Sequence, residues 1–189
     1  MSVTIPAPVL LLRPSTPADL PALTALYGWH ARHGSGTFEL EGPSLEEMTR
    51  RRDDVLDKGL PWLVAERHGD LLGYAYATPF RPRQAYRFAL EDSIYLAPQA
   101  HRQGVGRALL TELIARCEAW GARQMFAVIG DSANAASIGL HRALGFADVG
   151  TMRAAGWKFD RWLDVVIMQR TLGDGDATPP SDRAPAGGR

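Results

Sequence analysis

Apolar and polar positions follow both strand and helix periods along the first sixty residues. A short apolar run at 9–13 predicts a strand. Leucines then recur at spacings of three and four after Thr16, which predicts an amphipathic helix with Thr16 as its N-cap. Ser44, with Glu47 three residues later, is typical of a capping box. This pattern predicts a second helix that stops at Gly59.

The middle of the chain is dominated by strand patterns. Two apolar segments, 62–66 and 71–77, are separated by the tight polar turn 67–70 and predict a β-hairpin. A polar and basic segment, 81–87, predicts a loop or short helix. Another strand is expected at 90–96.

The last part of the pattern alternates between helix and strand. It predicts a long amphipathic helix that ends at Gly121, an apolar strand at 125–129 and a short helix at 134–144. Further strands are expected to start at 146–149 and to run over 162–171. A hairpin combined with two helical crossovers predicts an α/β fold, with a mixed sheet flanked by helices on both faces.

Composition indicates one globular domain, residues 1–172, followed by a tail at 173–189. The tail is rich in Gly, Pro, Asp, Ala and Ser, and is expected to be disordered. Lys+Arg and Asp+Glu are both 21, so net charge gives no reason to expect nucleic acid or an anionic membrane as a partner. The N-terminus lacks the pattern of a signal peptide, and no apolar run approaches the ~20 residues of a membrane span. We therefore expect a cytoplasmic protein.

A glycine-containing turn follows the 90–96 strand and opens the next helix. Backbone N–H groups in such a turn converge on an anion, and the helix N-terminus adds a positive dipole end. A βα turn without a ligand has the same pattern, so the motif alone leaves both readings open. Leu109 stands where a dinucleotide fingerprint needs its third glycine, and no Gly-Lys-Ser/Thr of a P-loop occurs. The turn and its flanks comprise Arg102, Gln103, Gly104, Val105, Gly106 and Arg107.

Two segments in the order found here resemble motifs of the GNAT superfamily of N-acetyltransferases. The stretch 101–106 resembles its pyrophosphate-binding pattern, Gln/Arg-x-x-Gly-x-Gly/Ala, with His101 in the first position. The segment 134–146 is similar to the superfamily helix that ends in Leu-Gly-Phe. The resemblance spans residues 9–172. It implies a mostly antiparallel sheet that splays between its fourth and fifth strands, with acetyl-CoA in the gap.

A narrower resemblance is to the phosphinothricin/methionine sulfoximine N-acetyltransferase subfamily. It implies an amino-acid substrate with a tetrahedral side-chain group, transfer of acetyl to its amine, and a homodimer. The segments that carry it are Trp62–Glu66, Gln84–Tyr86, Glu91–Leu96, Ala127–Gly130 and Arg153–Asp164.

The resemblance assigns two catalytic roles. Glu91 matches the base that takes the amine proton, whereas its position alone also fits a solvated edge-strand glutamate. His141 stands seven residues after Asn134, where many relatives have a tyrosine that protonates the departing thiolate. Imidazole, with an ordinary pKa of ~6.5, suits such proton transfer. Whether His141 is an acid, a base, a contact to CoA or a structural histidine stays open.

Cofactor contacts are implied along the same strand and helix. The backbone of Ile94, Tyr95 and Leu96 is expected to pair with the pantetheine arm, and a strand N–H to polarise the thioester oxygen. Asn134 is expected to bond the pantetheine amides, although an N-cap role explains it equally. Ser137 is assigned to the same site.

Substrate contacts are expected from an aromatic and from a basic segment. Phe38 matches a subfamily residue that lines the substrate pocket. Arg83, Tyr86 and Arg87 precede the Glu91 strand, and a guanidinium fork suits a carboxylate or phosphinate. A solvated loop face is the alternative for the arginines. No metal site is expected, because the histidines at 30 and 33 have no carboxylate or cysteine at ligand spacing.

These observations predict an acetyl-CoA-dependent N-acetyltransferase that modifies the α-amine of a small amino acid. Two alternatives stay open. One is an acetyltransferase for a protein N-terminus or a ribosomal protein. The other is an acyl-CoA-binding sensor domain without turnover, which titratable groups at both predicted catalytic positions disfavour.

Overall fold

The computed structural model describes residues 9–180 of the 189-residue chain. Short 3₁₀ turns occur at Pro17–Asp19, Gln84–Tyr86 and Pro98–Ala100. The helices and strands follow the predicted order. They are β1 (Leu11–Pro14), α1 (Leu20–His33), α2 (Leu45–Asp57), β2 (Trp62–Arg67), β3 (Asp70–Pro79), β4 (Ala89–Leu96), α3 (Val105–Trp120), β5 (Gln124–Gly130), α4 (Ala135–Ala143), β6 (Ala147–Lys158) and β7 (Arg161–Thr171).

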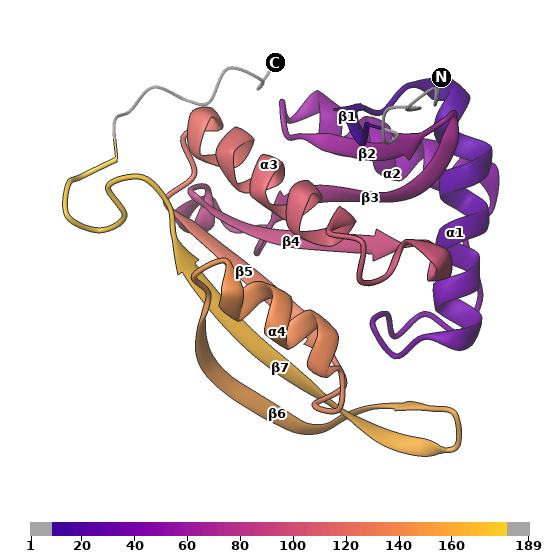
Figure 1. Cartoon of the computed structure of the whole chain (residues 1–189). Helices are drawn as coiled ribbons and strands as arrows, with labels where there is room; N and C mark the ends of the chain where they lie inside the picture. Colours follow the sequence, from indigo (N-terminus) through magenta and orange to yellow (C-terminus); the bar gives the residue numbers. More distant parts are fainter. Residues whose placement is uncertain (1–8, 181–189) are drawn as a thin grey trace, which may run out of the picture.

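All seven strands form one sheet in the order β1-β2-β3-β4-β5-β7-β6. Each neighbouring pair is antiparallel except β4 and β5, which run parallel. The parallel pair is joined through α3, as a parallel connection requires a crossover. The prediction of a mixed, mostly antiparallel α/β sheet is therefore confirmed (Figure 1).

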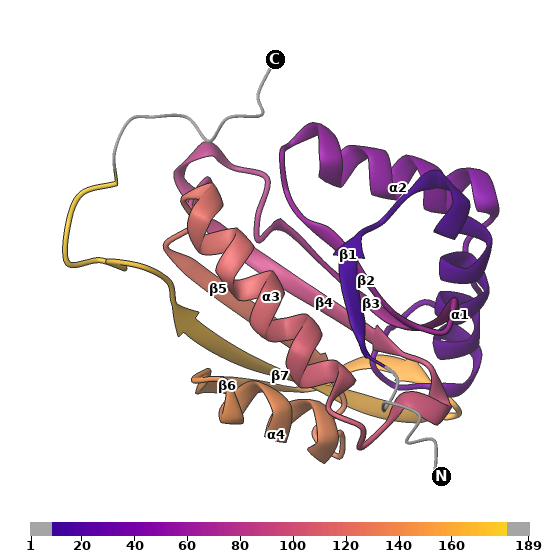
Figure 2. The same cartoon turned by 45° about the horizontal axis from the view of Figure 1, so that its top comes forward.

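Helices cover both faces of this sheet. α1 and α2 lie together on one side, and α3 and α4 lie on the other (Figure 2). Alternate side chains of β4 follow this division: Tyr95 packs against Tyr27 of α1, whereas Leu96 approaches Gly106 of α3. One continuous apolar core is buried between these layers. Its largest fully buried members include Leu23, Trp62, Leu63, Tyr74, Leu109, Leu113 and Met125.

Local signals were accurate for the first hairpin and incomplete for the last one. His68 and Gly69 both have positive φ, which suits the two-residue turn between β2 and β3. The strand expected at 146–149 instead continues to Lys158 as β6. β6 is interrupted by irregularities at 148–150 and 152–156, so it lacks the regular alternation that would have revealed its length.

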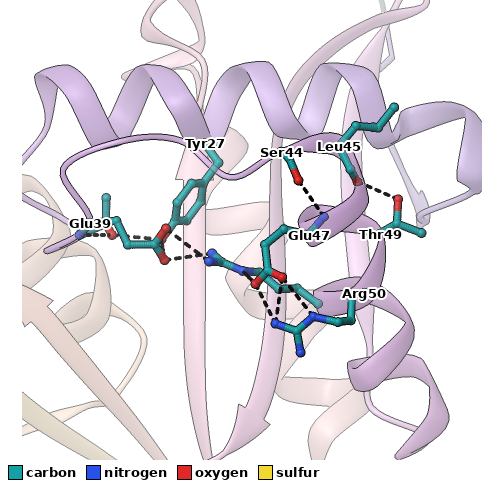
Figure 3. A network of polar contacts seen from close by, with 9 residues as sticks. Tyr27, Glu39, Ser44, Leu45, Glu47, Thr49 and Arg50 are labelled. Carbon is teal, nitrogen blue, oxygen red and sulfur yellow. Dashed lines mark hydrogen bonds and ion pairs between the residues drawn. The ribbon is translucent and has the colours of Figure 1, made fainter.

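The predicted capping box of α2 is only half formed. Ser44 Oγ accepts the N–H of Glu47 at 3.1 Å, as expected for an N-cap. The Glu47 carboxylate does not return to Ser44 but accepts bonds from Arg50 and Arg51 (Figure 3). Two nearby guanidinium groups thus take the place of the backbone donor.

The tail begins in the structure with a turn. Arg123 donates to the Gly175 carbonyl at 3.1 Å and to Thr178 Oγ1 at 3.2 Å. The rest of the tail for which disorder is predicted, 181–189, lies outside the described residues. No helix within residues 9–180 is long and apolar enough to cross a membrane.

Candidate active site

The sheet opens between its two parallel strands. β4 and β5 are paired only from Ala89↔Gln124 to Asp92↔Ala127. Beyond that point β4 continues along β3 and β5 continues along β7, so the two strands separate (Figure 1). Their facing backbone edges at 93–96 and 128–130 are left without each other as partners. This divergence is the splay that the sequence resemblance implied.

A cavity of about 740 Å³ occupies this opening. Its walls come from the end of α1, the loop 34–38, the diverging strands and the start of α4. Many of the residues expected at the site meet there, although they come from three separate segments. Those that line the cavity are Phe38, Glu91, Ile94, Tyr95, Leu96, Asn134, Ser137 and His141.

The alternation of β4 divides the cavity wall between two faces. Glu91 falls in the same register as Tyr95 and faces the α1 side. Asp92 points to the opposite side, where it contacts His141 of α4. Adjacent residues therefore present two carboxyl groups to the two faces of one opening.

The pKa of the Glu91 carboxyl group is raised toward neutral pH. Burial in the cavity wall raises its pKa to about 6, the neighbouring charge of Asp92 adds to this, and the guanidinium of Arg81 opposes it. Glu91 is therefore a carboxylate above about pH 6 and has a basicity suited to accepting a proton.

His141 is held by hydrogen bonds at both ring nitrogens. Nε2 lies 3.0 Å from Asp92 Oδ2, and Nδ1 lies 2.8 Å from the Ser137 carbonyl oxygen. Both partners are acceptors, so this geometry suits a ring that carries a proton on each nitrogen. Burial disfavours the charged ring, but the bond and charge of Asp92 and the Ser137 carbonyl outweigh it and raise the pKa of His141.

Asp92 was not among the residues expected at the site. Its side chain and that of His141 are each only 2% exposed, and Asp92 Oδ1 is buried without a hydrogen-bond partner. The only signal in the sequence was that Asp92 directly follows Glu91. This position did not indicate which face of β4 the Asp92 side chain occupies.

Asn134 is the N-cap of α4, one of the two roles that the sequence suggested for it. Its Oδ1 accepts the N–H of Ser137 at 3.2 Å, and its Nδ2 donates to the Gly130 carbonyl at 3.3 Å. These bonds fix the entry of α4 against the end of β5. They place the amide of Asn134 and the hydroxyl of Ser137 on the cavity wall.

The glycine turn lies directly beyond β4, at the N-terminus of α3. Gly104 is the N-cap and has φ 79°, a left-handed conformation that favours glycine. Gln103 is tied down because it accepts from Arg67 at 2.7 Å and donates to the Gln99 carbonyl at 2.6 Å. Arg102 and Arg107 are exposed and form no ion pair with another residue of the described chain. The turn thus offers free backbone donors and two free cations.

Lys158 is a second residue that sequence reasoning did not assign a role. It is 2% exposed, and its Nζ donates to the carbonyls of Gly34 at 2.8 Å and Thr37 at 2.7 Å. Burial lowers its pKa, whereas the charge of Glu39 opposes this shift. Lys158 lies at the end of β6, so it ties the loop 34–38 to the far half of the splayed sheet.

The other end of this loop is held by α1 and α2. Tyr27 Oη is 2.9 Å from Thr37 Oγ1 and donates to Glu39 at 2.8 Å, and Arg51 binds the same Glu39 carboxylate at 2.8 Å (Figure 3). The loop therefore bridges both halves of the sheet. It holds Phe38 against the cavity.

The basic segment before β4 does not reach the cavity. Arg83, Tyr86 and Arg87 are all exposed and are not among the residues that line it. Tyr86 packs edge-on against Phe80, and Arg87 stacks over Phe88. Because these contacts are local to the segment, the structure does not bring the three side chains to Glu91.

The histidines of α1 also have structural partners. His30 lines the cavity and its Nε2 lies 2.8 Å from the Leu96 carbonyl. His33 Nδ1 lies 2.9 Å from the Trp29 carbonyl. Within residues 9–180 no group of three His, Cys, Asp or Glu side chains is arranged to hold a metal ion.

Comparison with known proteins identifies the family of this chain. Residues 23–146 match the model of the acetyltransferase (GNAT) family. The chain belongs to the GNAT family. It is an N-acetyltransferase, and β4 and β5, the strands that form the splayed opening, lie within the matched residues.

Individual relatives are similar in sequence to this protein over most of the chain. Phosphinothricin N-acetyltransferase of Alcaligenes faecalis is 59% identical over 86% of this chain and 82% of that protein. The L-methionine sulfoximine/L-methionine sulfone acetyltransferase of Pseudomonas aeruginosa is 38% identical over 85% of this chain and 94% of its own length.

The crystal structure of a GNAT phosphinothricin acetyltransferase from Sinorhizobium meliloti in complex with AcCoA has 49% sequence identity and a TM-score of 0.89. The match covers 92% of this chain and 94% of that one. The predicted GNAT fold is confirmed, as is the resemblance to this subfamily.

Proposed function

We propose that this GNAT protein transfers the acetyl group of acetyl-CoA to the α-amine of an amino acid of the phosphinothricin or methionine sulfoximine type. The observation that carries the proposal is the position of Glu91. Its carboxyl group, with a pKa of about 6, lies in the cavity wall just where β4 and β5 begin to separate. The relatives named above are acetyltransferases for such amino acids, and one relative binds AcCoA.

The unpaired edge of β4 suits the pantetheine arm of acetyl-CoA. Residues 93–96 have backbone groups without a β5 partner, and an amide-bearing arm between the strands satisfies them. A backbone N–H on this edge also suits the thioester oxygen, on which negative charge develops during attack. Ile94, Tyr95 and Leu96 supply this edge, and Asn134 and Ser137 supply polar groups across the gap.

The turn before α3 suits the pyrophosphate. The first N–H groups of an α-helix have no intrahelical acceptor, and the helix dipole favours an anion there. Gly104 leaves this surface open, because no atom lies within 4 Å of where its Cβ would be. Arg102 and Arg107 neutralise the phosphate charges.

Acetyl transfer then follows from the placement of Glu91. The substrate amine gives a proton to the Glu91 carboxylate and attacks the thioester carbon, so that a C–N bond forms. The C–S bond breaks and CoA leaves as a thiolate, which takes up one proton. Glu91 returns the amine proton to solvent. Phe38, held over the same face, limits the size of the amine that reaches Glu91.

Initial rates of thiol release test this function. The amines are phosphinothricin, methionine sulfoximine, methionine sulfone, ordinary amino acids, polyamines and an N-terminal ribosomal peptide. We expect turnover with the first three at a kcat/KM well above the rest. Turnover with the peptide alone assigns the protein to protein acetylation, and binding of acetyl-CoA without turnover of any amine favours the sensor alternative.

The phosphate cradle makes a separate prediction. Replacing Arg102 by Asn and Arg107 by Gln removes both free cations, and Asn tolerates the φ of 59° at position 102. A hydrogen bond to a charged group contributes about 1.5–3 kcal/mol, so we expect the KM for acetyl-CoA to rise at least tenfold. Steady-state kinetics with acetyl-CoA as the varied substrate measure this rise. An unchanged KM overturns the assignment of the turn.

The homodimer implied by the resemblance and the cytoplasmic location expected from the sequence pattern stay predictions. Light scattering of the purified protein measures the first of them. The exposed side chains of Arg83, Tyr86 and Arg87 keep their proposed part in substrate binding only if a second copy or a movement of their segment brings them to the opening.

A further inference from the structure

The buried pair of Asp92 and His141 is poorly explained by a structural role alone. A buried ion pair costs desolvation, and apolar residues of similar volume are often equally stable in its place. Asp92 Oδ1 is buried without a hydrogen-bond partner among the described residues, and an unsatisfied buried group destabilises the fold. This cost requires an explanation, and the pair lines the cavity.

The pair lies on the face of β4 opposite to Glu91. Asp92 shares its register with Ile94 and Leu96, whose side chains approach α3, and it meets His141 of α4. The amine face therefore holds a base, and the other face holds a group that carries a proton. Separation by the strand itself keeps the two proton-transfer steps apart.

We infer that Asp92 is a positioning residue that keeps His141 as an imidazolium, from which the departing CoA thiolate receives its proton. The inference rests on the proposed function for the identity of the thioester. In this step the thiolate takes the Nε2 proton that His141 otherwise donates to Asp92 Oδ2, so the Nε2–H bond breaks and an S–H bond forms. The neutral ring keeps its Nδ1–H bond to the Ser137 carbonyl, and one proton from solvent restores the imidazolium.

The surroundings of the pair contain few other ionisable groups. Glu91 is the neighbour on the same strand, and its pKa is raised in part by the Asp92 charge. Cys117 of α3 also faces Asp92; burial, together with the charges of Asp92 and Glu118, raises the pKa of its thiol, so it stays neutral. Ala77 of β3 and Ala127 of β5, the strand partners of Asp92, carry no charge.

Asp92→Asn is the matched test, because it keeps the shape of the side chain and removes its charge. In the unaltered protein the Asp92 carboxylate disfavours loss of the proton from Glu91 and favours the protonated ring of His141. Its loss therefore lowers both pKa values. We expect both limbs of the kcat–pH profile to move to lower pH. We also expect kcat near neutral pH to fall roughly 10²-fold, with the KM for acetyl-CoA within about twofold of the wild type.

Asp131→Asn is the control variant. Asp131 is another buried carboxyl of the cavity wall, paired with Arg161 at 2.6 Å, and it does not contact His141. Its removal is expected to leave both pH limbs in place. A fall in kcat for Asp92→Asn with both limbs unmoved overturns the inference, because a purely structural pair predicts that result.

A second measurement uses the unaltered protein and needs no turnover. NMR of isotope-labelled histidine reports whether each ring nitrogen of His141 carries a proton. We expect both to stay protonated at a pH above the ordinary imidazole pKa of ~6.5, where a free imidazole is mostly singly protonated. A singly protonated His141 at that pH overturns the inference even if the protein acetylates every amine proposed above. Absence of turnover with a doubly protonated ring instead overturns the proposed function alone.

Discussion

Replacement of Glu91 by Gln is expected to lower kcat/KM for the amine by about 10²–10⁴-fold, the usual contribution of a positioned general base. Glutamine fills the same space in the cavity wall but does not accept the proton of the attacking amine. The KM for acetyl-CoA is expected to stay close to its original value, because the cofactor is held by the turn before α3 and by the β4 edge. Steady-state kinetics with each substrate varied in turn separate the two effects.

The pH dependence gives this prediction its sign. The pKa of Glu91 is raised to about 6, so the carboxylate is lost as the pH falls through that value. The unaltered protein is expected to lose kcat/KM below about pH 6 along a limb that belongs to Glu91. Ionisation of the free amine contributes a limb at higher pH in both proteins. In Glu91→Gln the limb near pH 6 is expected to disappear, whereas the amine limb and the descending limb of His141 remain.

Glu112→Gln serves as the control for this comparison. Glu112 lies on α3, pairs with Arg116 at 2.8 Å and is not part of the cavity wall. Its pH profile is expected to match that of the unaltered protein. A limb near pH 6 that persists in Glu91→Gln contradicts the assignment of the base.

Replacement of Gly156 by Ala is expected to have the second-largest effect. A Cβ at position 156 would overlap the ring of Phe38, and the other side of that ring lies close to Gly130. The clash therefore displaces the partly exposed ring of Phe38 from its place on the cavity wall. A displacement of about 1 Å near reacting groups costs about 10²-fold, so we expect kcat/KM for the amine to fall by that factor.

The control for this variant lies on the same strand. No atom lies within 4 Å of a Cβ built at Gly150, so Gly150→Ala is expected to leave amine kinetics unaltered. Thermal melting of both variants separates a local displacement from a loss of fold. Equal kinetics for Gly156→Ala and Gly150→Ala would contradict the role given to Phe38.

The order of the elements was predictable because each element carries its own signal. Helical spacing and the turn at 67–70 are local features that correspond to elements of the structure, whereas the capping box predicted at Ser44 formed only in part. β6 was predicted too short because its bulges and exposed residues remove the alternation on which a strand prediction depends. The family resemblance, rather than periodicity, predicted the splay between β4 and β5.

The site was predictable only where a motif marked it. Glu91, His141 and Asn134 stand in motifs, and the structure brings all three to one cavity. Lys158 donates to the carbonyl of Thr37, 121 residues away, and Asp92 contacts the ring of His141, 49 residues away. No local pattern in the sequence reveals either contact. Arg83 was selected for its charge, and charge alone does not tell a substrate ligand from a solvated side chain.

The central claim is that the opening between β4 and β5 acetylates a small amino acid rather than a protein N-terminus. The most direct measurement is a competition, in which the protein and acetyl-CoA are mixed with equal concentrations of phosphinothricin and an N-terminal ribosomal peptide. Mass spectrometry then follows both products. We expect an acetyl group on the α-amine of phosphinothricin and an unmodified peptide. Acetylation of the peptide with phosphinothricin unchanged would contradict the account.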